Sequence, residues 1–246
     1  MRKSYSYQKN MILSLKNFLL DILFPLQCLG CKKEGKILCE SCKTTLPMLP
    51  PICIGCGRMT PDKPPLPAGH TCKRCKKETH ISVFLSPLPY RHPLVNRLIH
   101  EYKYRRIRML AGVFADLLTR YIASYRIVFP KQTLIIPIPL HPRKQRVRGF
   151  NQATLMAHEL SIRFSLTIDT QTLTRITATP PQAMLTARLR RENVQHIFSA
   201  RNTAALRGKN IILVDDVKTT GATLEQAAFV LKKAGAKQIW TVTIAH

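Results

Sequence analysis

The sequence predicts an α/β protein built on a parallel sheet, with a small cysteine-rich domain in front of it. From Val83 onward, apolar runs alternate with helical stripes of apolar side chains, and this alternation is typical of a parallel sheet covered by helices. The four apolar residues Ile211–Val214 are typical of a strand buried on both faces. All eight cysteines precede the alternating pattern. We therefore expect a leader helix at residues 1–24, a cysteine-rich domain at 25–80 and the α/β domain at 81–246.

The charge balance is the most unusual feature of the composition. The chain has 246 residues, of which 45% are hydrophobic, enough for a packed core. It carries 39 lysines and arginines against 13 aspartates and glutamates, a formal net charge of +26. Such an excess favours polyanionic partners, nucleic acid before anionic membrane. The alternative is that the basic residues only solvate the surface, although a solvated face normally mixes both signs.

Residues Asn10 to Phe24 have the spacing of an amphipathic helix. The segment is too short and too charged to span a bilayer. Lys16 and Asp21 interrupt the apolar core that a secretory signal requires. We interpret the segment as a helix that docks on the body of the protein. With no export or membrane segment recognised elsewhere, the sequence predicts no membrane span and a cytoplasmic location.

The cysteines come as four Cys-x-x-Cys pairs, a spacing that predicts metal binding. Each pair presents two thiolates from one turn, and two pairs complete a tetrahedral zinc site with four sulfurs. We therefore expect two structural zinc ions in this segment, because so short a segment cannot fold on a hydrophobic core alone. Disulfides would need an oxidising compartment. Sequential pairing of the ligands closes shorter loops than interleaved pairing, which stays open. The expected ligands are Cys28, Cys31, Cys39, Cys42, Cys53, Cys56, Cys72 and Cys75.

Two carboxylates and a hydroxyl-rich loop follow the buried strand near the C-terminus. Asp215 and Asp216 come directly after Val214, at the carboxyl end of the strand, where open α/β sheets bind ligands. The next residues can aim backbone N–H groups and hydroxyls at an anion, in front of a helix whose dipole adds positive potential. Carboxylates can then hold ribose hydroxyls while the loop holds a phosphate. A Walker A loop is excluded because no lysine follows Gly221. The predicted sugar-phosphate site comprises Asp215, Asp216, Thr219, Thr220, Gly221, Ala222 and Thr223.

Two basic clusters precede this site in the chain. The first includes a tyrosine, and single-stranded nucleic acid is bound by such a mixture, with cations for the backbone and rings for base stacking. The second follows an apolar strand predicted at Leu134–Leu140. The candidate nucleic-acid residues are Lys103, Tyr104, Arg105, Arg106 and Arg108, and the second cluster comprises Arg143, Lys144, Arg146 and Arg148.

Periodicity places the remaining elements of the α/β domain. It predicts helices at the stripes Leu94–Tyr102 and Phe114–Ile122, along Ala153–Phe164 and at Thr223–Ala234, strands at Thr172–Ile176 and Ile239–Ala245, and a loop at His141–Gln152. The segment Thr177–Ala200 has no strong period.

The stretch around the two aspartates resembles the PRPP-binding motif of the type I phosphoribosyltransferases, in which an apolar run is followed by two acids and a Thr-Gly-x-Thr loop. Nearly the whole chain resembles the ComF family of competence proteins. Besides the zinc ribbon and the Asp215 loop, this resemblance is carried by Leu98–Tyr104, Pro137–Leu140, Arg148–Gln152, Pro181–Leu185 and Arg191–Val194. It implies a type I phosphoribosyltransferase-like domain behind a double zinc ribbon. It also implies a role in natural transformation, after DNA has entered the cytoplasm as a single strand. The implied partners are single-stranded DNA, PRPP and other competence or recombination proteins.

The resemblance also implies a chemistry for the site. In a transferase of this type, pyrophosphate is displaced from the anomeric carbon of PRPP while Mg²⁺ neutralises the leaving group. Asp215 and Asp216 would be the catalytic residues, binding ribose hydroxyls directly or through the metal, and the loop would bind the 5′-phosphate. The cluster Arg143–Arg148 would stabilise the departing pyrophosphate. Purine-salvage members carry an acid in the phosphate loop where this chain has Thr219, so a purine acceptor is not predicted.

Two functions therefore stay open. The first is a competence protein that binds incoming single-stranded DNA and carries a PRPP and Mg²⁺ site, used for sensing or for an unidentified transfer. The alternative is a metabolic phosphoribosyltransferase acting on a nucleobase or amine. A zinc-ribbon adaptor would leave Asp215 and Asp216 unexplained. The first function predicts DNA binding that weakens steeply with salt, and the second predicts pyrophosphate release from PRPP.

Overall fold

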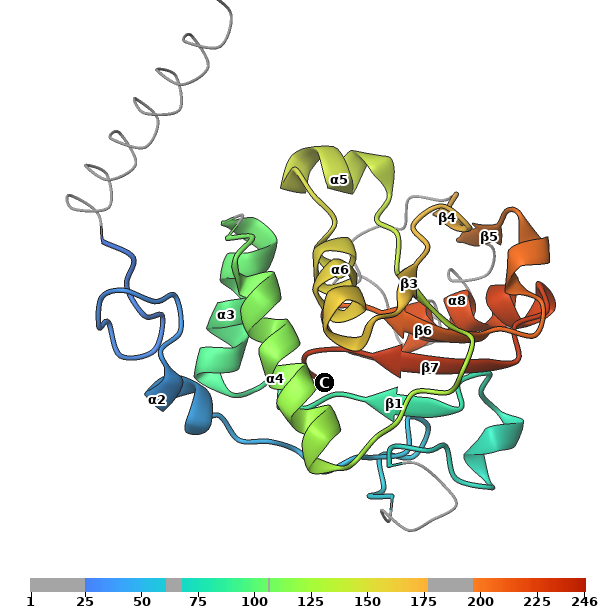
Figure 1. Ribbon diagram of the computed structural model, residues 1–246, viewed down its shortest axis with the longest axis horizontal. Helices are drawn as coiled ribbons and strands as arrows, with labels where there is room; N and C mark the ends of the chain where they lie inside the picture. Colours follow the sequence, from blue (N-terminus) through green and yellow to red (C-terminus); the bar gives the residue numbers. More distant parts are fainter. Residues whose placement is uncertain (1–24, 61–67, 106, 177–196) are drawn as a thin grey trace, which may run out of the picture. The chain divides into compact units, whose positions relative to one another are not determined.

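Figure 1 shows the computed structural model, which describes residues 25–60, 68–105, 107–176 and 197–246. The expected leader helix, Arg106 and the motifs Pro181–Leu185 and Arg191–Val194 lie outside the described residues. The chain divides into two compact units, Met1–Leu46 and Pro47–His246, and each is considered by itself. Among the described residues, no helix has the length and apolar character needed to cross a membrane.

The described part of the first unit, residues 25–46, has little regular structure. Its helix α2 (Glu40–Thr44) begins after Cys39, whose sulfur accepts the backbone N–H of Cys42 at 3.5 Å. An isolated bridge pairs Gln27 with Glu34. A unit of this size cannot gain enough stability from apolar burial alone, so it depends on its cysteines.

Among the described residues, the second unit contains a sheet of five parallel strands in the order β1-β7-β6-β2-β3. The parallel sheet predicted from the alternating pattern is confirmed. Strand β6 is central, between β7 and β2, and all its residues are buried. The two aspartates therefore leave the sheet from its middle strand. The strands are β1 (Val83–Leu85), β2 (Thr133–Pro137), β3 (Thr167–Ile168), β6 (Asn210–Val214) and β7 (Gln238–Val242).

Helix α8 (Ala222–Lys233) covers one face of the sheet. Side chains of a strand point alternately to its two faces, and Ile211 and Leu213 of β6 share a core with Leu224 and Leu231 of α8. The helix therefore starts directly after the loop that follows the aspartates, and it packs along the face of the sheet formed by Ile211 and Leu213.

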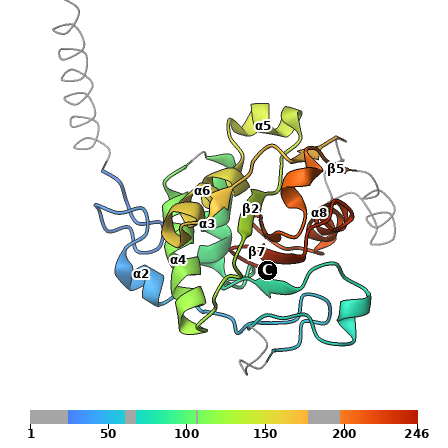
Figure 2. The ribbon, with the colours of Figure 1, turned by 45° about the vertical axis from the view of Figure 1, so that its right-hand side comes forward.

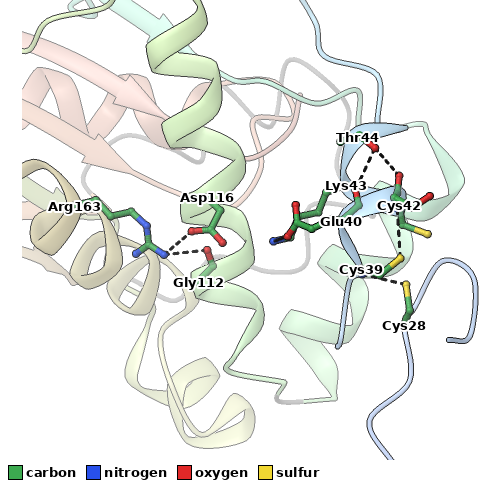
Figure 3. Close-up of polar contacts among 10 residues, drawn as sticks. Cys28, Cys39, Glu40, Cys42, Lys43, Thr44, Gly112, Asp116 and Arg163 are labelled. Carbon is green, nitrogen blue, oxygen red and sulfur yellow. Dashed lines mark hydrogen bonds and ion pairs between the residues drawn. The ribbon is translucent and has the colours of Figure 1, made fainter. Parts of the chain in front are cut away.

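Among the described elements, three helices lie on the other side of the sheet. Helix α6 (Gln152–Phe164) packs against β2, β3 and β6, α4 (Leu110–Ser124) packs against α6, and α3 (Pro93–Tyr104) packs against α4. Arg163 of α6 binds Asp116 of α4 with an Nη2–Oδ1 distance of 2.7 Å (Figure 3). Both faces of β6 are thus covered, which explains why this strand is apolar from Ile211 to Val214.

The segment expected to be a loop contains a helix, α5 (Pro142–Arg148). Proline is favoured at the first position of a helix, and His141 Nδ1 accepts the backbone N–H of Arg143 at 3.2 Å. Gly149 ends the helix in a left-handed conformation with φ of 80°. The expectation of a loop was wrong because these residues have end signals of a helix but no apolar stripe.

The strand expected at Thr172–Ile176 exists but belongs to a separate ribbon. Strand β4 (Leu173–Arg175) pairs antiparallel with β5 (Phe198–Ala200), whereas β3 lies beside β2 at the edge of the main sheet. A strand as short as β3 has too little pattern to be recognised in the sequence. Strand β5 contacts α8 (Figure 2). The described elements also include 3-10 helices at Cys75–Lys77 and Thr203–Leu206.

The second half of the cysteine-rich segment belongs to the same unit as the sheet and covers its edge. Strand β1 is an edge strand, and His70 forms an antiparallel bridge with its Val83. Phe84 donates its N–H to the Gly69 carbonyl at 2.9 Å. Gly69 has φ of 78°, and a Cβ there would lie 2.3 Å from the Phe84 carbonyl oxygen, so only glycine fits. The edge is therefore protected from pairing with another chain.

Candidate functional site

The two aspartates lie where the central strand ends. Asp215 donates its backbone N–H to the Val242 carbonyl of β7 at 3.0 Å, and its Oδ1 accepts the N–H of Asp216 at 2.8 Å. Asp216 is buried and Asp215 is half-buried. Burial and the charge of Asp216 raise the pKa of Asp215 to about 7, although Lys103 opposes this. Two adjacent carboxylates held by the backbone in this way can accept hydrogen bonds from neighbouring hydroxyls of a sugar.

The loop after the aspartates forms a small pocket at the N-terminus of α8. Gly221 is the N-cap of this helix and has φ of 82°, and Ala222 donates its N–H to Thr220 Oγ1 at 3.4 Å. Thr219 and Thr220 are exposed. Hydroxyls, backbone N–H groups at a helix start and the helix dipole together favour an anion. The pocket is lined by Asp215, Val217, Lys218, Thr219, Gly221, Ala222, Thr223 and Leu224.

A lysine from a helix distant in the sequence forms an ion pair with one of the two aspartates. Lys103 lies in the last turn of α3, and its Nζ is 2.8 Å from Asp216 Oδ1. The two side chains are only 18% and 12% exposed. Burial would lower the pKa of Lys103, but Asp216 and Asp215 outweigh burial and raise the pKa. The lysine therefore stays charged and neutralises part of the negative charge of the pair.

The side chain of Gln152 holds Lys103 and Arg148 close to each other. Its Nε2 donates to the Lys103 carbonyl at 3.4 Å, and its Oε1 accepts from Arg148 Nη1 at 3.3 Å. Gln152 is 1% exposed, so these bonds satisfy a buried amide. The phenol of Tyr102 donates to the Gln152 carbonyl at 2.7 Å. The end of α3 and the start of α6 are thus joined beside the aspartates.

The second basic cluster divides into an inner and an outer face of α5. Lys144 and Arg148 are four residues apart, so they share one face of the helix. They are half-buried, whereas Arg143 and Arg146 are exposed. Burial, followed by Arg175 and Arg148, lowers the pKa of Lys144. The positive charges of Arg175 and Arg148 thus act on Lys144 together with its burial.

The eight cysteines, all of which the structure describes, form two clusters of free thiols. In each cluster the sulfur atoms lie within 4.8 Å of one another, which suits four thiolates around one tetrahedral zinc ion at about 2.3 Å each. The grouping is sequential, the arrangement that the sequence favoured. One cluster lies in each compact unit. The first comprises Cys28, Cys31, Cys39 and Cys42, and the second comprises Cys53, Cys56, Cys72 and Cys75.

The two clusters share a pattern of backbone donors. The N–H of Cys39 donates to Cys28 Sγ at 3.4 Å (Figure 3), and the N–H of Cys72 donates to Cys53 Sγ at the same distance of 3.4 Å. Burial would raise the pKa of the Cys28 thiol, but backbone N–H groups outweigh burial and lower the pKa to about 6. The same balance lowers the pKa of Cys53 to about 7. Since zinc binds the thiolate form, these donors favour metal binding at both clusters.

Known proteins share this architecture. The chain matches a double zinc ribbon domain at residues 19–76 and a phosphoribosyl transferase domain at residues 147–246. It is 33% identical over 211 residues to the DNA utilization protein YhgH of Salmonella typhi, with 82% of this chain and 88% of that protein covered. It is also 30% identical over 221 residues to competence protein F of Haemophilus influenzae, with 86% of each chain covered. The chain belongs to the ComF family. Competence protein ComFC of Bacillus subtilis is a further relative, 30% identical over 219 residues, with 82% of this chain and 81% of that protein covered.

The family resemblance, the α/β fold and the N-terminal double zinc ribbon are thus confirmed. In this ComF-family protein, the pocket after β6 is lined by five of the seven predicted sugar-phosphate residues, all except Asp216 and Thr220. Of the second basic cluster, Lys144 and Arg148 are on the inner face of α5, while Arg143 and Arg146 point to solvent. The ligands of these residues stay predictions.

The first basic cluster is divided between the site and the surface. Lys103 binds Asp216, and Tyr104 is 60% exposed. Arg148 places its guanidinium 5.4 Å from the centre of the Tyr104 ring. Arg105 and Arg108 are exposed, and we call Tyr104, Arg105 and Arg108 the basic strip. The basic strip therefore adjoins α5 through the contact between Tyr104 and Arg148.

Two residues at the site were not predicted for it. Lys103 was assigned to nucleic acid, and Arg175 was not singled out at all. Arg175 lies over the Phe198 ring at 5.6 Å, and the charge of Asp215 attracts it, opposing the burial that lowers its pKa. No spacing in the sequence signals these neighbours, because α3, β4 and β6 approach one another only in the fold.

Proposed function

We propose that this ComF-family protein acts in the cytoplasm during natural transformation, binding incoming single-stranded DNA and carrying a site for PRPP with Mg²⁺. Relatives named as competence proteins and as a DNA utilization protein support this setting. One observation carries the proposed ligand. Asp215 lines the anion pocket before α8, Lys103 of α3 binds the neighbouring Asp216, and Gln152 hydrogen-bonds both the Lys103 carbonyl and Arg148 of α5.

PRPP has a chemical group for each part of this site. Its ribose hydroxyls suit Asp215 and Asp216, and its 5′-phosphate suits the pocket before α8. Its pyrophosphate suits the cations Lys144 and Arg148. Mg²⁺ prefers carboxylate and phosphate oxygens, so the aspartates and the ligand would hold it together. The metal would supply neutralisation of the pyrophosphate charge.

The basic strip is the proposed contact for DNA. Tyr104 offers an exposed ring for base stacking, and Arg105 and Arg108 offer cations for phosphates. Arg148 contacts Tyr104 and is hydrogen-bonded to Gln152, which also bonds the Lys103 carbonyl beside the aspartates. Because one guanidinium contacts both regions, we expect DNA and PRPP to alter each other's affinity.

Titration calorimetry tests the PRPP site. PRPP with Mg²⁺ is titrated into the wild type and into Asp215→Asn/Asp216→Asn, each with and without an oligothymidylate. We expect saturable binding by the wild type and a loss of at least about tenfold in the double variant, because hydrogen bonds to charged groups contribute about 1.5–3 kcal/mol. Asp116→Asn on α4 removes one carboxylate charge away from the site and serves as the control. Equal binding by all three proteins would contradict the proposal.

Salt-dependent binding of a fluorescent oligothymidylate tests the DNA contact. We expect Arg105→Gln to reduce the salt slope by about 0.7, the value for one phosphate contact on a single strand. Tyr104→Ala is expected to weaken binding at every salt concentration through lost stacking. Arg126→Gln, beyond the far end of α4, is the matched control. Binding by the wild type that is insensitive to salt would exclude this function.

The same preparations distinguish the metabolic alternative. Pyrophosphate release is measured after PRPP is mixed with a panel of nucleobases and amines. Release that requires Asp215 and Asp216 and does not respond to DNA would favour a metabolic phosphoribosyltransferase. Release that appears only with DNA present would tie the site to DNA handling.

A further inference from the structure

A second cavity, with a volume of about 430 Å³, lies along α8. Its size is within the range of small-molecule sites, about 300–1,000 Å³. Its walls come from α8, from β5 and from the segment before β1, all within the second unit. Among the described residues, it shares no lining residue with the pocket before α8. It is lined by His80, Phe198, Glu225, Gln226, Phe229, Val230 and Lys233.

One wall of this cavity is fixed by hydrogen bonds of Glu225. Its Oε2 accepts from Thr79 Oγ1 at 2.5 Å, and its Oε1 accepts the backbone N–H of His80 at 2.9 Å. His80 Nδ1 lies 2.6 Å from the same Oε1. The Glu225 carboxylate is therefore bound by Thr79 and His80. These bonds attach the segment before β1 to α8.

Phe229 provides the aromatic surface that a ligand in the cavity can reach. It is half-buried, and its ring centre is 5.2 Å from that of His80 in a T-shaped contact. Phe198 is only 4% exposed and packs in the core behind the wall. A fixed, partly exposed ring such as Phe229 suits a planar aromatic ligand, because a base of any kind can stack on an aromatic side chain.

Two polar side chains in the cavity can bind an anion and the edge of a base. The Lys233 ammonium lies 4.6 Å from the centre of the Phe229 ring, and the side chain is exposed. A lysine on a flexible stem can move from the ring to a phosphate. Gln226 carries an amide with both donor and acceptor groups, the combination that pairs with base edges.

We propose that this cavity binds a nucleobase that carries a phosphate, with the base against Phe229 and the phosphate on Lys233. The ligand is either a free mononucleotide or one nucleotide of a DNA strand, since both present the same base and phosphate. The cavity is a second site, and its occupation does not depend on PRPP binding at the aspartates.

Equilibrium binding of labelled dAMP, dTMP and an oligothymidylate tests this site. We expect Phe229→Leu and Lys233→Gln to weaken binding of at least one probe by about fivefold or more, given about 1–3 kcal/mol for a stacked base. Phe229→Leu keeps an apolar side chain in the wall, and Lys233→Gln changes an exposed residue, so both variants are expected to fold. Lys237→Gln, beyond the end of α8 and exposed, is the matched control for charge.

Two further measurements separate this cavity from the PRPP site and identify the source of the ligand. Thr223→Val alters the pocket before α8 and is expected to leave the nucleotide affinity unchanged, whereas Phe229→Leu is expected to leave PRPP affinity unchanged. Binding of mononucleotides supports a free nucleotide, and binding of the oligonucleotide alone supports a strand. The proposal is overturned if no probe binds at millimolar concentration, if an abasic oligonucleotide binds as tightly, or if Thr223→Val abolishes binding that Phe229→Leu leaves intact.

Discussion

The ion pair between Lys103 and Asp216 sets the charge of the candidate site. Both side chains are largely buried, and the atoms are 2.8 Å apart. Removing one partner of such a pair leaves an uncompensated charge, which is more costly than replacing both partners with apolar groups. Lys103 thus binds Asp216, whereas Tyr104, the next residue in the chain, is exposed to solvent.

Lys103→Met is expected to weaken binding of PRPP with Mg²⁺ several-fold, because Asp216 loses the ammonium group that holds its carboxylate in place. Lys103→Arg keeps the charge and should retain more of the affinity. Calorimetry gives the affinities, with Lys131→Met at an exposed position as the control. The salt slope for DNA is expected to stay unchanged in Lys103→Met. A slope reduced as much as in Arg105→Gln would mean that the lysine faces DNA instead.

Gly221 is a second residue on which the site depends. It has φ of 82°, and an added Cβ would lie 3.3 Å from Lys218 Cε. Gly221→Ala is expected to cost about 1 kcal/mol of unfolding free energy, because a left-handed conformation strains any side chain. It should also weaken PRPP binding by distorting the loop. Gly208 has φ of 70°, and an added Cβ would have no atom within 4 Å, so Gly208→Ala should destabilise similarly in urea unfolding but leave PRPP affinity intact.

The two faces of helix α5 differ in how far their basic side chains are exposed. The spacing of four residues places Lys144 and Arg148 inward, and the same spacing rule leaves Arg143 and Arg146 in solvent. If charge alone mattered, all four cations would contribute equally to binding pyrophosphate. The fold makes them different because Lys144 and Arg148 are half-buried, whereas Arg143 and Arg146 are exposed.

Single substitutions to glutamine on α5 test this division. Lys144→Gln and Arg148→Gln are expected to weaken PRPP binding several-fold, whereas Arg143→Gln and Arg146→Gln should change it by less than about twofold, as expected for exposed charges. Calorimetry at constant ionic strength gives the comparison. Equal losses at all four positions would indicate a diffuse electrostatic attraction.

Elements differ in how far the sequence predicts them. Strand β6 was predicted because both of its faces are buried and its apolar run is uninterrupted. Helix α5 was missed because it has no buried residue and hence no hydrophobic period. Strand β3 was missed because pairing with β2, not local pattern, defines it. Periodicity thus finds the elements that bury side chains and overlooks those held by capping or by partners.

At the scale of the whole molecule, the two cysteine clusters have different neighbours. The second cluster belongs to the unit that contains the sheet, and its segment covers the edge strand β1 through Gly69 and His70. The first cluster belongs to a separate compact unit. Zinc at the second cluster would therefore support the sheet as well as its own loop.

Removal of one zinc site at a time tests this difference. Cys72→Ser and Cys39→Ser should each reduce bound zinc from two ions to one, measured by elemental analysis. Only Cys72→Ser is expected to lower the unfolding midpoint reported by Trp240 fluorescence. Trp240 is 3% exposed and lies opposite Val83 of β1 in the sheet. An equal shift in both variants would mean that the two units unfold together.

The sequence by itself determined the features whose residues are close together in the chain. The Asp215–Thr223 stretch combines a buried strand, two acids and a helix start within a few residues, and each Cys-x-x-Cys pair sits on one turn, so local chemistry identifies both. Only the tertiary structure decided which distant groups join them. Lys103 reaches Asp216 because α3 and β6 end at the same side of the fold. The second cysteine cluster protects β1 because an edge strand needs a partner for its backbone, and that partner is chosen by packing, not by spacing in the chain.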